Sequence, residues 1–273
     1  MKKGATLHRD LALTTKIFAD GADFDGIMQM YRNPLIKGFT TNPTLMRKAG
    51  IADYEGFARR VLEAIVDRPV SFEVFADDFP AMIQQGKTIG SWGSNVNVKI
   101  PVTTTSGEFC GPVIEELSRV GIAVNVTAVM TLDQVRRIVD CLAVETPAII
   151  SIFTGRIADT GRDPVSLMQE ALQLMRARPK AELIWASPRE LLNIFQAGAI
   201  GCHIITVTND LLAKLALVGK DLDEYSLDTV RMFRRDALAA NYRITTSAEH
   251  SSGDGTESDH EVAAMEAVLA PIS

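Results

Sequence analysis

A single lysine interrupts an apolar run at residues 95–103, which read NVNVKIPVT. Val98 and Ile100 flank Lys99, and the alternation of β-branched with polar residues is typical of a buried strand. A free lysine has a pKa of about 10.4, so it is a poor nucleophile at neutral pH. Among apolar walls or other cations, the neutral amine can attack a carbonyl and form a Schiff base. Lys99 is therefore the candidate nucleophile for cleaving or forming the carbon–carbon bond next to that carbonyl.

Two carboxylates could supply the proton transfers that a Schiff-base reaction needs. Asp20 ends the apolar run of residues 16–20, and Glu73 lies within the run of residues 70–76. Such a reaction requires a general acid–base near the carbinolamine and near the hydroxyl of the bond that breaks. Alternatively, Lys99 forms only a buried ion pair with Glu73 or Asp20. The spacing of these residues leaves both interpretations open.

Further polar residues fall at the ends of other predicted strands. They are Thr40, Thr41, Asn42, Asn125, Thr127, Ser151 and Ser187. Two arginines, Arg156 and Arg189, follow neighbouring strands, and guanidinium groups bind phosphate oxygens in a bidentate way. Taken singly, each arginine is better explained by a surface salt bridge. Together at adjacent strand ends, they favour a phosphorylated substrate.

The elements that must position these side chains are eight short apolar runs. They span residues 16–20, 38–42, 70–76, 95–101, 121–129, 148–155, 182–187 and 202–208. Helical periodicity lies between them, most clearly over residues 53–67 and 132–144. This alternation predicts a single-domain (β/α)8 TIM barrel over residues 16–244, with its chemistry at the C-terminal ends of the strands. A doubly wound sheet is the rival, but no G-x-G-x-x-G follows any run.

The two ends of the chain differ in composition from the predicted barrel. Residues 1–15 form a polar N-terminal lead-in. Residues 245–273 begin with a stretch rich in serine, glycine and acidic residues, which predicts an acidic, flexible C-terminal tail.

Overall composition limits the kinds of partner, metal site and location that the sequence predicts for the protein. A formal net charge of −6 over 273 residues argues against nucleic acid or an anionic membrane as a partner. Three widely spaced cysteines predict neither a disulfide framework nor a zinc site. The N-terminus lacks the apolar region of a signal peptide, and no uninterrupted apolar run reaches the length of a membrane span. These features predict a cytoplasmic protein.

Five segments, in order along the chain, resemble motifs of the transaldolase family of class I aldolases. They are GFTTNPTL (38–45), VKIPVT (98–103), NVTAV (125–129), ISIFTGRIAD (150–159) and WASPRE (185–190). The first resembles the family's G-x-T-[TS]-N-P-[ST] signature and the second the segment around its Schiff-base lysine. The resemblance covers about residues 16–243, most of the chain.

The resemblance implies a role for each matching residue. Lys99 would form the Schiff base with a ketose donor, and Asp20 would act as acid–base at the donor hydroxyl. Glu73 and Thr127 would hold and activate the water of carbinolamine dehydration. The remaining matched positions would bind substrate: donor hydroxyls at Asn42, Asn125 and Ser151, and phosphate at Arg156, Ser187 and Arg189. Thr40, Thr41 and Phe153 would complete the substrate pocket.

The resemblance implies a transaldolase of pentose phosphate metabolism that moves a dihydroxyacetone unit from fructose 6-phosphate or sedoheptulose 7-phosphate to an aldose phosphate. It implies no metal and no organic cofactor. Sugar phosphates are the expected partners, together with further copies of the chain in a homo-oligomer.

Two alternatives remain. Fructose 6-phosphate aldolases of the same family release dihydroxyacetone, and they carry Gln and Tyr where this chain has Glu73 and Phe153. A non-catalytic sugar-phosphate-binding barrel is the alternative outside enzymes.

Overall fold

The computed structural model describes residues 13–244. Residues 1–12, which make up most of the predicted lead-in, and the predicted tail, residues 245–273, lie outside the described residues. The described residues divide into two units, residues 13–218 and 219–244. The range of 16–244 that we predicted for the barrel therefore also includes the helix Leu222–Ala239, which this division assigns to the second unit.

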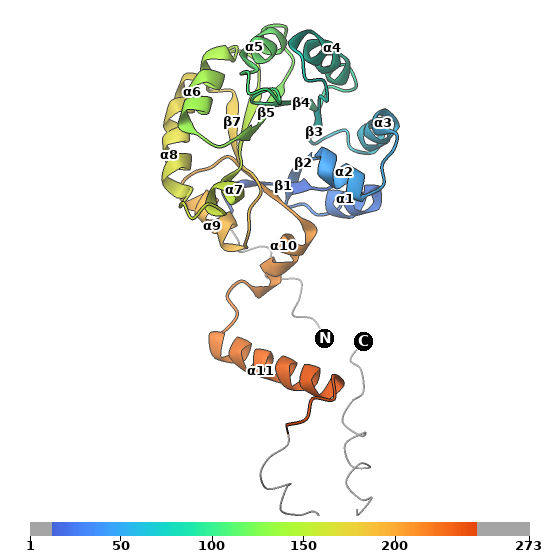
Figure 1. The fold of residues 1–273 in the computed structure, drawn as a ribbon, viewed down its shortest axis with the longest axis vertical. Helices are drawn as coiled ribbons and strands as arrows, with labels where there is room; N and C mark the ends of the chain where they lie inside the picture. The colour runs from blue at the N-terminus through green and yellow to red at the C-terminus, as the bar shows by residue number, and fades with distance from the viewer. Residues whose placement is uncertain (1–12, 245–273) are drawn as a thin grey trace, which may run out of the picture. The chain divides into compact units, whose positions relative to one another are not determined.

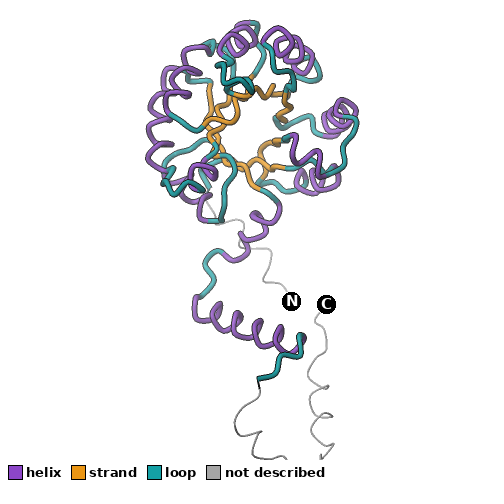
Figure 2. The backbone as a smooth tube through the Cα atoms, viewed as in Figure 1, coloured by secondary structure: helices purple, strands orange, loops and turns teal. Residues whose placement is uncertain are grey.

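Eight parallel strands close into a barrel in the order β1 to β8, which confirms the predicted (β/α)8 TIM barrel. Figure 2 shows the strands as an inner ring surrounded by helices. The strands are β1 Lys16–Asp20, β2 Ile36–Thr40, β3 Val70–Glu73, β4 Val96–Pro101, β5 Val124–Val129, β6 Ala148–Ile152, β7 Ala181–Trp185 and β8 Ile204–Val207.

Helices follow the strands and cover the outside of the barrel (Figure 1). In the first unit they are α1 Phe24–Tyr31, α2 Pro43–Lys48, α3 Tyr54–Ala64, α4 Phe79–Gly90, α5 Gly111–Arg119, α6 Leu132–Cys141, α7 Thr154–Ala158, α8 Val165–Leu174, α9 Leu192–Ala199 and α10 Asn209–Ala213, with 3₁₀ turns at Met175–Ala177 and Lys214–Leu217. The second unit contains α11 Leu222–Ala239.

Local sequence explains where several of these helices begin. Asn42 accepts the backbone N–H of Leu45, and Pro43 occupies the first turn of α2, where a missing N–H costs nothing. Thr131 and Gln134 form a reciprocal capping box at the start of α6.

Five predicted strands, those over residues 38–42, 70–76, 148–155, 182–187 and 202–208, extended beyond the observed ones at their C-terminal ends, and local structure explains three of these ends. β2 ends at Thr40, because Asn42 already caps α2. β6 ends at Ile152, because Phe153 is the N-cap residue of α7. β7 ends at Trp185, and Ser187 takes a positive φ of 59°, which no strand residue adopts. The predicted site residues Thr41, Asn42, Phe153 and Ser187 therefore lie just after the strands, whereas Thr40 and Ser151 lie on them.

An apolar cluster fills part of the barrel interior. It comprises Phe18 on β1, Ile149 on β6, Ile184 on β7, Ala186 just after β7 and Ile204 on β8, with Phe153 packed against it. Gly38 on β2 makes room for this cluster, since a Cβ there would lie 2.5 Å from the Phe18 ring. The larger core lies between the barrel and its helices, and it includes Phe72, Val98 and Leu183.

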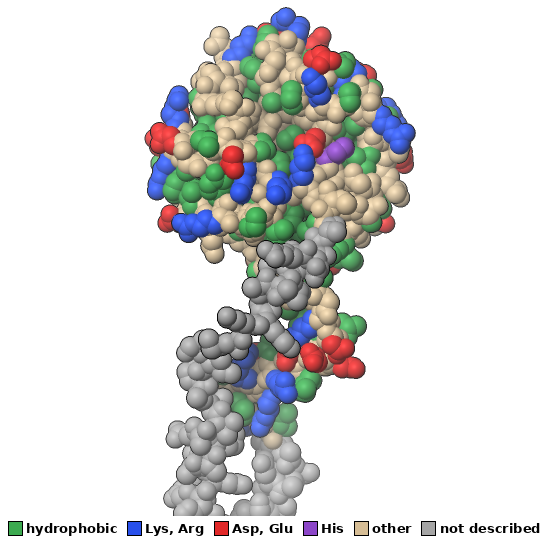
Figure 3. All heavy atoms as spheres, turned by 180° about the vertical axis from the view of Figure 1, so that it is seen from behind, with side chains coloured by type: hydrophobic (Ala, Val, Ile, Leu, Met, Phe, Trp, Pro, Cys, Tyr) green, Lys and Arg blue, Asp and Glu red, His purple; other side chains and the backbone are tan. Residues whose placement is uncertain are grey.

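Charges of both signs are interspersed on the face of the first unit that Figure 3 displays, without a continuous basic surface there. Within residues 13–244, no helix combines the length and apolar character needed to cross a membrane. The same residues contain no cluster of three His, Cys, Asp or Glu side chains arranged to hold a metal ion.

Candidate active site

A pocket of about 530 Å³ opens where the strands of the barrel end. All of the predicted site residues except Thr41 line it: Asp20, Thr40, Asn42, Glu73, Lys99, Asn125, Thr127, Ser151, Phe153, Arg156, Ser187 and Arg189. Residues from seven strands and the loops that follow them thus meet at one site. Thr41 contributes its backbone carbonyl, as described next.

Lys99 lies on β4 and is only 6% exposed. Its ammonium donates to the carbonyl oxygen of Thr41 at 2.7 Å and lies 3.3 Å from Glu73 Oε2. The ion pair that the sequence left as an alternative is therefore present. Because Lys99 also lines the pocket, its amine can be reached by a substrate carbonyl, and Glu73 lies within reach of any proton that such a reaction moves.

Asp20 ends β1, and Thr40 on the neighbouring strand β2 donates to its Oδ1 at 2.9 Å. Burial raises the pKa of Asp20 above its ordinary value of 3.8, although the Lys99 charge and the Thr40 hydrogen bond oppose this shift. A carboxyl group with a raised pKa can both accept and return a proton, as general acid–base catalysis requires.

A chain of hydrogen bonds crosses the polar side of the barrel interior. Ser151 donates to Asn125 Oδ1 at 2.7 Å, and Asn125 Nδ2 donates to Ser71 Oγ at 3.1 Å. These bonds hold the Asn125 amide in one orientation. We did not predict Ser71, although its position two residues before Glu73, on the same face of β3, was a usable signal.

Thr127 differs from its neighbours because its buried hydroxyl has no hydrogen-bond partner among the described residues. The pairing of β5 with β6 shifts register between Val126 and Val129, and Ala128 takes a positive φ of 62° in this bulge. Bulges of this kind redirect side chains beside functional sites. The unpaired hydroxyl faces the pocket, where a bound molecule or a water can satisfy it.

The arginines lie at the mouth of the pocket. Arg189 is 48% exposed and forms a bidentate salt bridge with Asp159, while the Arg156 guanidinium lies over the Phe153 ring at 5.3 Å from its centroid. The two loops approach closely, since a Cβ on Gly155 would lie 1.7 Å from the carbonyl oxygen of Ser187. Only glycine permits this contact, which brings Arg156 and Arg189 to the same wall.

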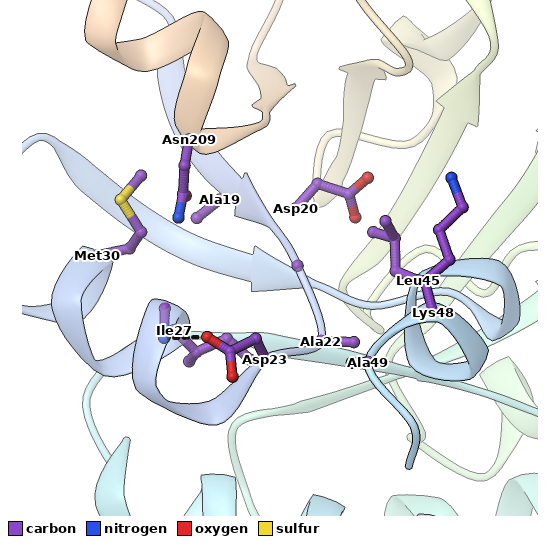
Figure 4. A pocket seen from close by; sticks show the side chains of 12 residues that line it. Ala19, Asp20, Ala22, Asp23, Ile27, Met30, Leu45, Lys48, Ala49 and Asn209 are labelled. Carbon is purple, nitrogen blue, oxygen red and sulfur yellow. Dashed lines mark hydrogen bonds between the residues drawn. The ribbon is translucent and has the colours of Figure 1, made fainter.

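Eight residues that were not predicted from the sequence also line the pocket, and three of them are polar: Thr44, Lys48 and Thr206. Lys48 lies on the exposed side of α2, where a lysine in a last helical turn carries no signal of a site. Together with Asp20 and Leu45, it also lines an adjoining pocket of about 260 Å³. In Figure 4, Asp20 and Lys48 lie at one end of that pocket and Met30 and Asn209 at the other.

The pocket therefore combines one buried amine, two carboxylates, an unpaired hydroxyl and two arginines. An amine beside carboxylates suits carbonyl chemistry through covalent catalysis. The arginines at the mouth suit an anionic substituent on the same molecule.

The fold is shared with 3-hexulose-6-phosphate synthase from Salmonella typhimurium, whose structure superposes with a TM-score of 0.51 at 13% identity, covering 75% of this chain and 98% of that one. At this identity the likeness concerns the fold alone. It places the protein in the class of (β/α)8 barrels.

Sequence comparison identifies the family within that class. The profile of the family described as Transaldolase/Fructose-6-phosphate aldolase matches residues 17–261. A probable transaldolase of Nitrosopumilus maritimus is 34% identical over 206 residues, covering 73% of this chain and 86% of that protein. A probable transaldolase of Dehalococcoides mccartyi is 32% identical over 201 residues, covering 73% and 89% respectively. The chain belongs to the transaldolase/fructose-6-phosphate aldolase family, and it is a transaldolase-type enzyme.

Proposed function

We propose that the protein transfers a dihydroxyacetone unit from a ketose phosphate, fructose 6-phosphate or sedoheptulose 7-phosphate, to an aldose phosphate through a Schiff base on Lys99. The observation that carries this proposal is the position of Lys99. Its buried amine lies beside Glu73 and lines the pocket, and the arginines lie at the pocket mouth.

The reaction begins when the neutral Lys99 amine attacks the donor's C2 carbonyl. The resulting carbinolamine loses its hydroxyl as water, which leaves a protonated imine. Glu73 lies 3.3 Å from the amine nitrogen and can carry the protons of this step. The Thr127 hydroxyl, which has no partner within residues 13–244, is available to hold the departing water.

Asp20 then accepts the proton of the donor's C4 hydroxyl. The C3–C4 bond breaks, its electron pair moves into the imine, and an enamine of dihydroxyacetone remains on Lys99 while the aldehyde product leaves. The raised pKa of Asp20 supports this role, because such a carboxyl can return the proton to the new alkoxide when an acceptor aldehyde reacts.

Phosphate binding is assigned to Arg156, Ser187 and Arg189. Both guanidinium groups line the same wall, so a phosphate at the far end of the sugar would lie there while C2 reaches Lys99. Phe153, between this wall and the apolar interior, offers no proton donor to the enamine. Together with Glu73, it favours transfer to an acceptor over release of dihydroxyacetone.

Two measurements test the proposal. Borohydride reduction in the presence of fructose 6-phosphate should add the mass of a reduced dihydroxyacetone unit to Lys99. A sugar-binding barrel without catalysis would gain no mass. An assay with fructose 6-phosphate, with and without erythrose 4-phosphate, should show consumption that depends on the acceptor. Equal rates of dihydroxyacetone release with and without acceptor would instead support the aldolase.

We also propose that the chain forms a homo-oligomer. Helix α11, taken by itself, carries the apolar side chains Leu222, Val230 and Phe233. An apolar helix face of this size is unstable in water unless something covers it, and closed homo-oligomers are the commonest assemblies. Light scattering should report a multiple of the 29.7 kDa chain mass that decreases in V230D/F233D. A monomeric wild type would refute this.

A further inference from the structure

The backbone pairing between β2 and β3 stops before it reaches the level of Glu73 and Lys99. Only Phe39 with Val70 and Thr40 with Ser71 pair across this seam, whereas β3 and β4 continue to pair as far as Glu73 with Lys99. The Val74 N–H donates to the carbonyl of Lys99 on the β4 side at 3.1 Å. Since successive residues of a strand bond to opposite neighbours, the N–H and C=O of Glu73 face β2, where no strand partner remains.

The hydroxyl of Tyr54 occupies this gap. It accepts the N–H of Glu73 at 2.7 Å and donates to the C=O of the same residue at 3.0 Å. One phenol thus replaces both hydrogen bonds that a longer β2 would have made. We infer that Tyr54 is a positioning residue for Glu73 in the Schiff-base chemistry, an inference that rests on the proposed function.

The phenol itself is held firmly. Tyr54 is the first residue of α3, and the preceding Asp53 caps that helix through the N–H of Gly56. Its ring packs against Phe72, Phe75 and Trp92, with centroids 6.2, 4.6 and 6.0 Å away. Burial raises the pKa of Tyr54, so the hydroxyl stays protonated and can donate to the Glu73 carbonyl.

The open seam is useful to the site because it gives Lys99 its two partners. On the β2 side, the Thr41 carbonyl accepts from the ammonium at 2.7 Å, and on the β3 side, Glu73 supplies the carboxylate. A continuous β2–β3 ladder would direct the Thr41 and Glu73 backbone groups at each other. Tyr54 satisfies the Glu73 backbone and leaves the Thr41 carbonyl to Lys99.

The test is Tyr54→Phe, which keeps the ring and removes only the hydroxyl. The kcat for dihydroxyacetone transfer should fall about tenfold to a hundredfold, because misplacing a catalytic group by about 1 Å can cost a hundredfold. The single-turnover rate of borohydride-trappable Schiff base should fall by the same factor. The KM for fructose 6-phosphate should stay within about twofold, since the arginines are untouched.

A double-mutant cycle separates positioning from general damage. Tyr54→Phe in a Glu73→Gln background should cause no further loss, whereas equal losses in both backgrounds would overturn the inference. Tyr31→Phe is the matched control, because it removes a phenol hydroxyl that bonds the exposed Asp67 at 2.7 Å and should leave kcat unchanged. Wild-type kcat in Tyr54→Phe would also refute the proposal.

A structural measurement keeps the inference distinct from the proposed function. If the wild type neither transfers nor traps dihydroxyacetone, the proposed function fails. Crystal structures of wild type and Tyr54→Phe would still decide the positioning role. The separation of Lys99 Nζ and Glu73 Oε2, 3.3 Å here, should increase in the variant. An unchanged separation would overturn the inference.

Discussion

The two levels of the pocket are built differently. The floor consists of Glu73, Lys99, Asn125 and Ser151, all on strands, and the rim consists of Phe153, Arg156, Ser187 and Arg189, all on the loops and short helix that follow β6 and β7. The floor residues Lys99, Asn125 and Ser151 are 6% exposed or less. Asn125 and Ser151 are hydrogen-bonded to residues of other strands, and Lys99 to the Thr41 carbonyl just after β2. Both rim arginines are exposed.

Because of this difference, the floor is suited to the chemical steps and the rim to the choice of substrate. A nucleophile must keep its place within a fraction of an ångström, and barrel strands provide that rigidity. A rim of exposed side chains can exchange partners, as Arg189 would when a phosphate competes with Asp159. We therefore expect changes in the floor to lower turnover, most strongly at Lys99, and changes in the rim to alter substrate affinity or the fate of the intermediate.

The largest effect is expected from Lys99→Ala. No other lysine lies on the floor within the described part of the chain, so turnover and borohydride trapping should both be lost while the circular dichroism spectrum stays that of the wild type. Lys180→Ala, which removes an exposed lysine bonded to Glu145, is the control and should keep full activity. Trapping at the wild-type extent in Lys99→Ala would place the nucleophile elsewhere.

A change in the rim should act on binding. Arg156→Ala and Arg189→Ala should each raise the KM for fructose 6-phosphate about ten- to a hundredfold, since a hydrogen bond to a charged group contributes about 1.5–3 kcal/mol. Dihydroxyacetone as donor, which lacks phosphate, should be affected little. Arg162→Ala, an exposed arginine near the same loop, is the matched control. Equal KM increases for both donors would argue against phosphate binding at the rim.

Phe153 is the rim residue that packs against the apolar interior, so the effect of replacing it should be smaller and should concern the fate of the enamine. Phe153→Tyr places a proton donor near the intermediate and should raise the release of free dihydroxyacetone several-fold, about threefold to tenfold, relative to transfer. Adding Glu73→Gln should strengthen the shift. The ratio of release to transfer is measured with and without erythrose 4-phosphate. A wild type that already releases dihydroxyacetone as fast as it transfers it would refute the transferase assignment.

The residues of the floor could be placed from the sequence more accurately than those of the rim. Lys99 and Asn125 could be located because strand periodicity places alternate residues inside a barrel, and the fold followed from the βα alternation. Thr41, Ser187 and Phe153 were placed on strands that end earlier, since helix caps and a positive φ decide those ends locally. Tyr54 and its bonds to Glu73 could not be predicted, because they depend on where the β2–β3 pairing stops.

The smallest expected effect concerns stability at the floor's edge. Burial raises the pKa of Asp20, so the folded protein holds this proton more tightly than the unfolded chain does. The stability that neutral Asp20 contributes is fully present below about pH 3.8, its ordinary pKa, and is lost as the pH rises through the raised value. Asp20→Asn, which is neutral at every pH, should therefore melt at a higher temperature than the wild type at pH 7, and this difference should vanish near pH 4.

Asp77→Asn provides the opposite control: hydrogen bonds from Thr105 lower the pKa of Asp77, so its replacement should lower the melting temperature at pH 7. A melting temperature of Asp20→Asn below the wild type at pH 7 would mean that the Lys99 charge outweighs burial and that Asp20 stabilises the fold as a carboxylate.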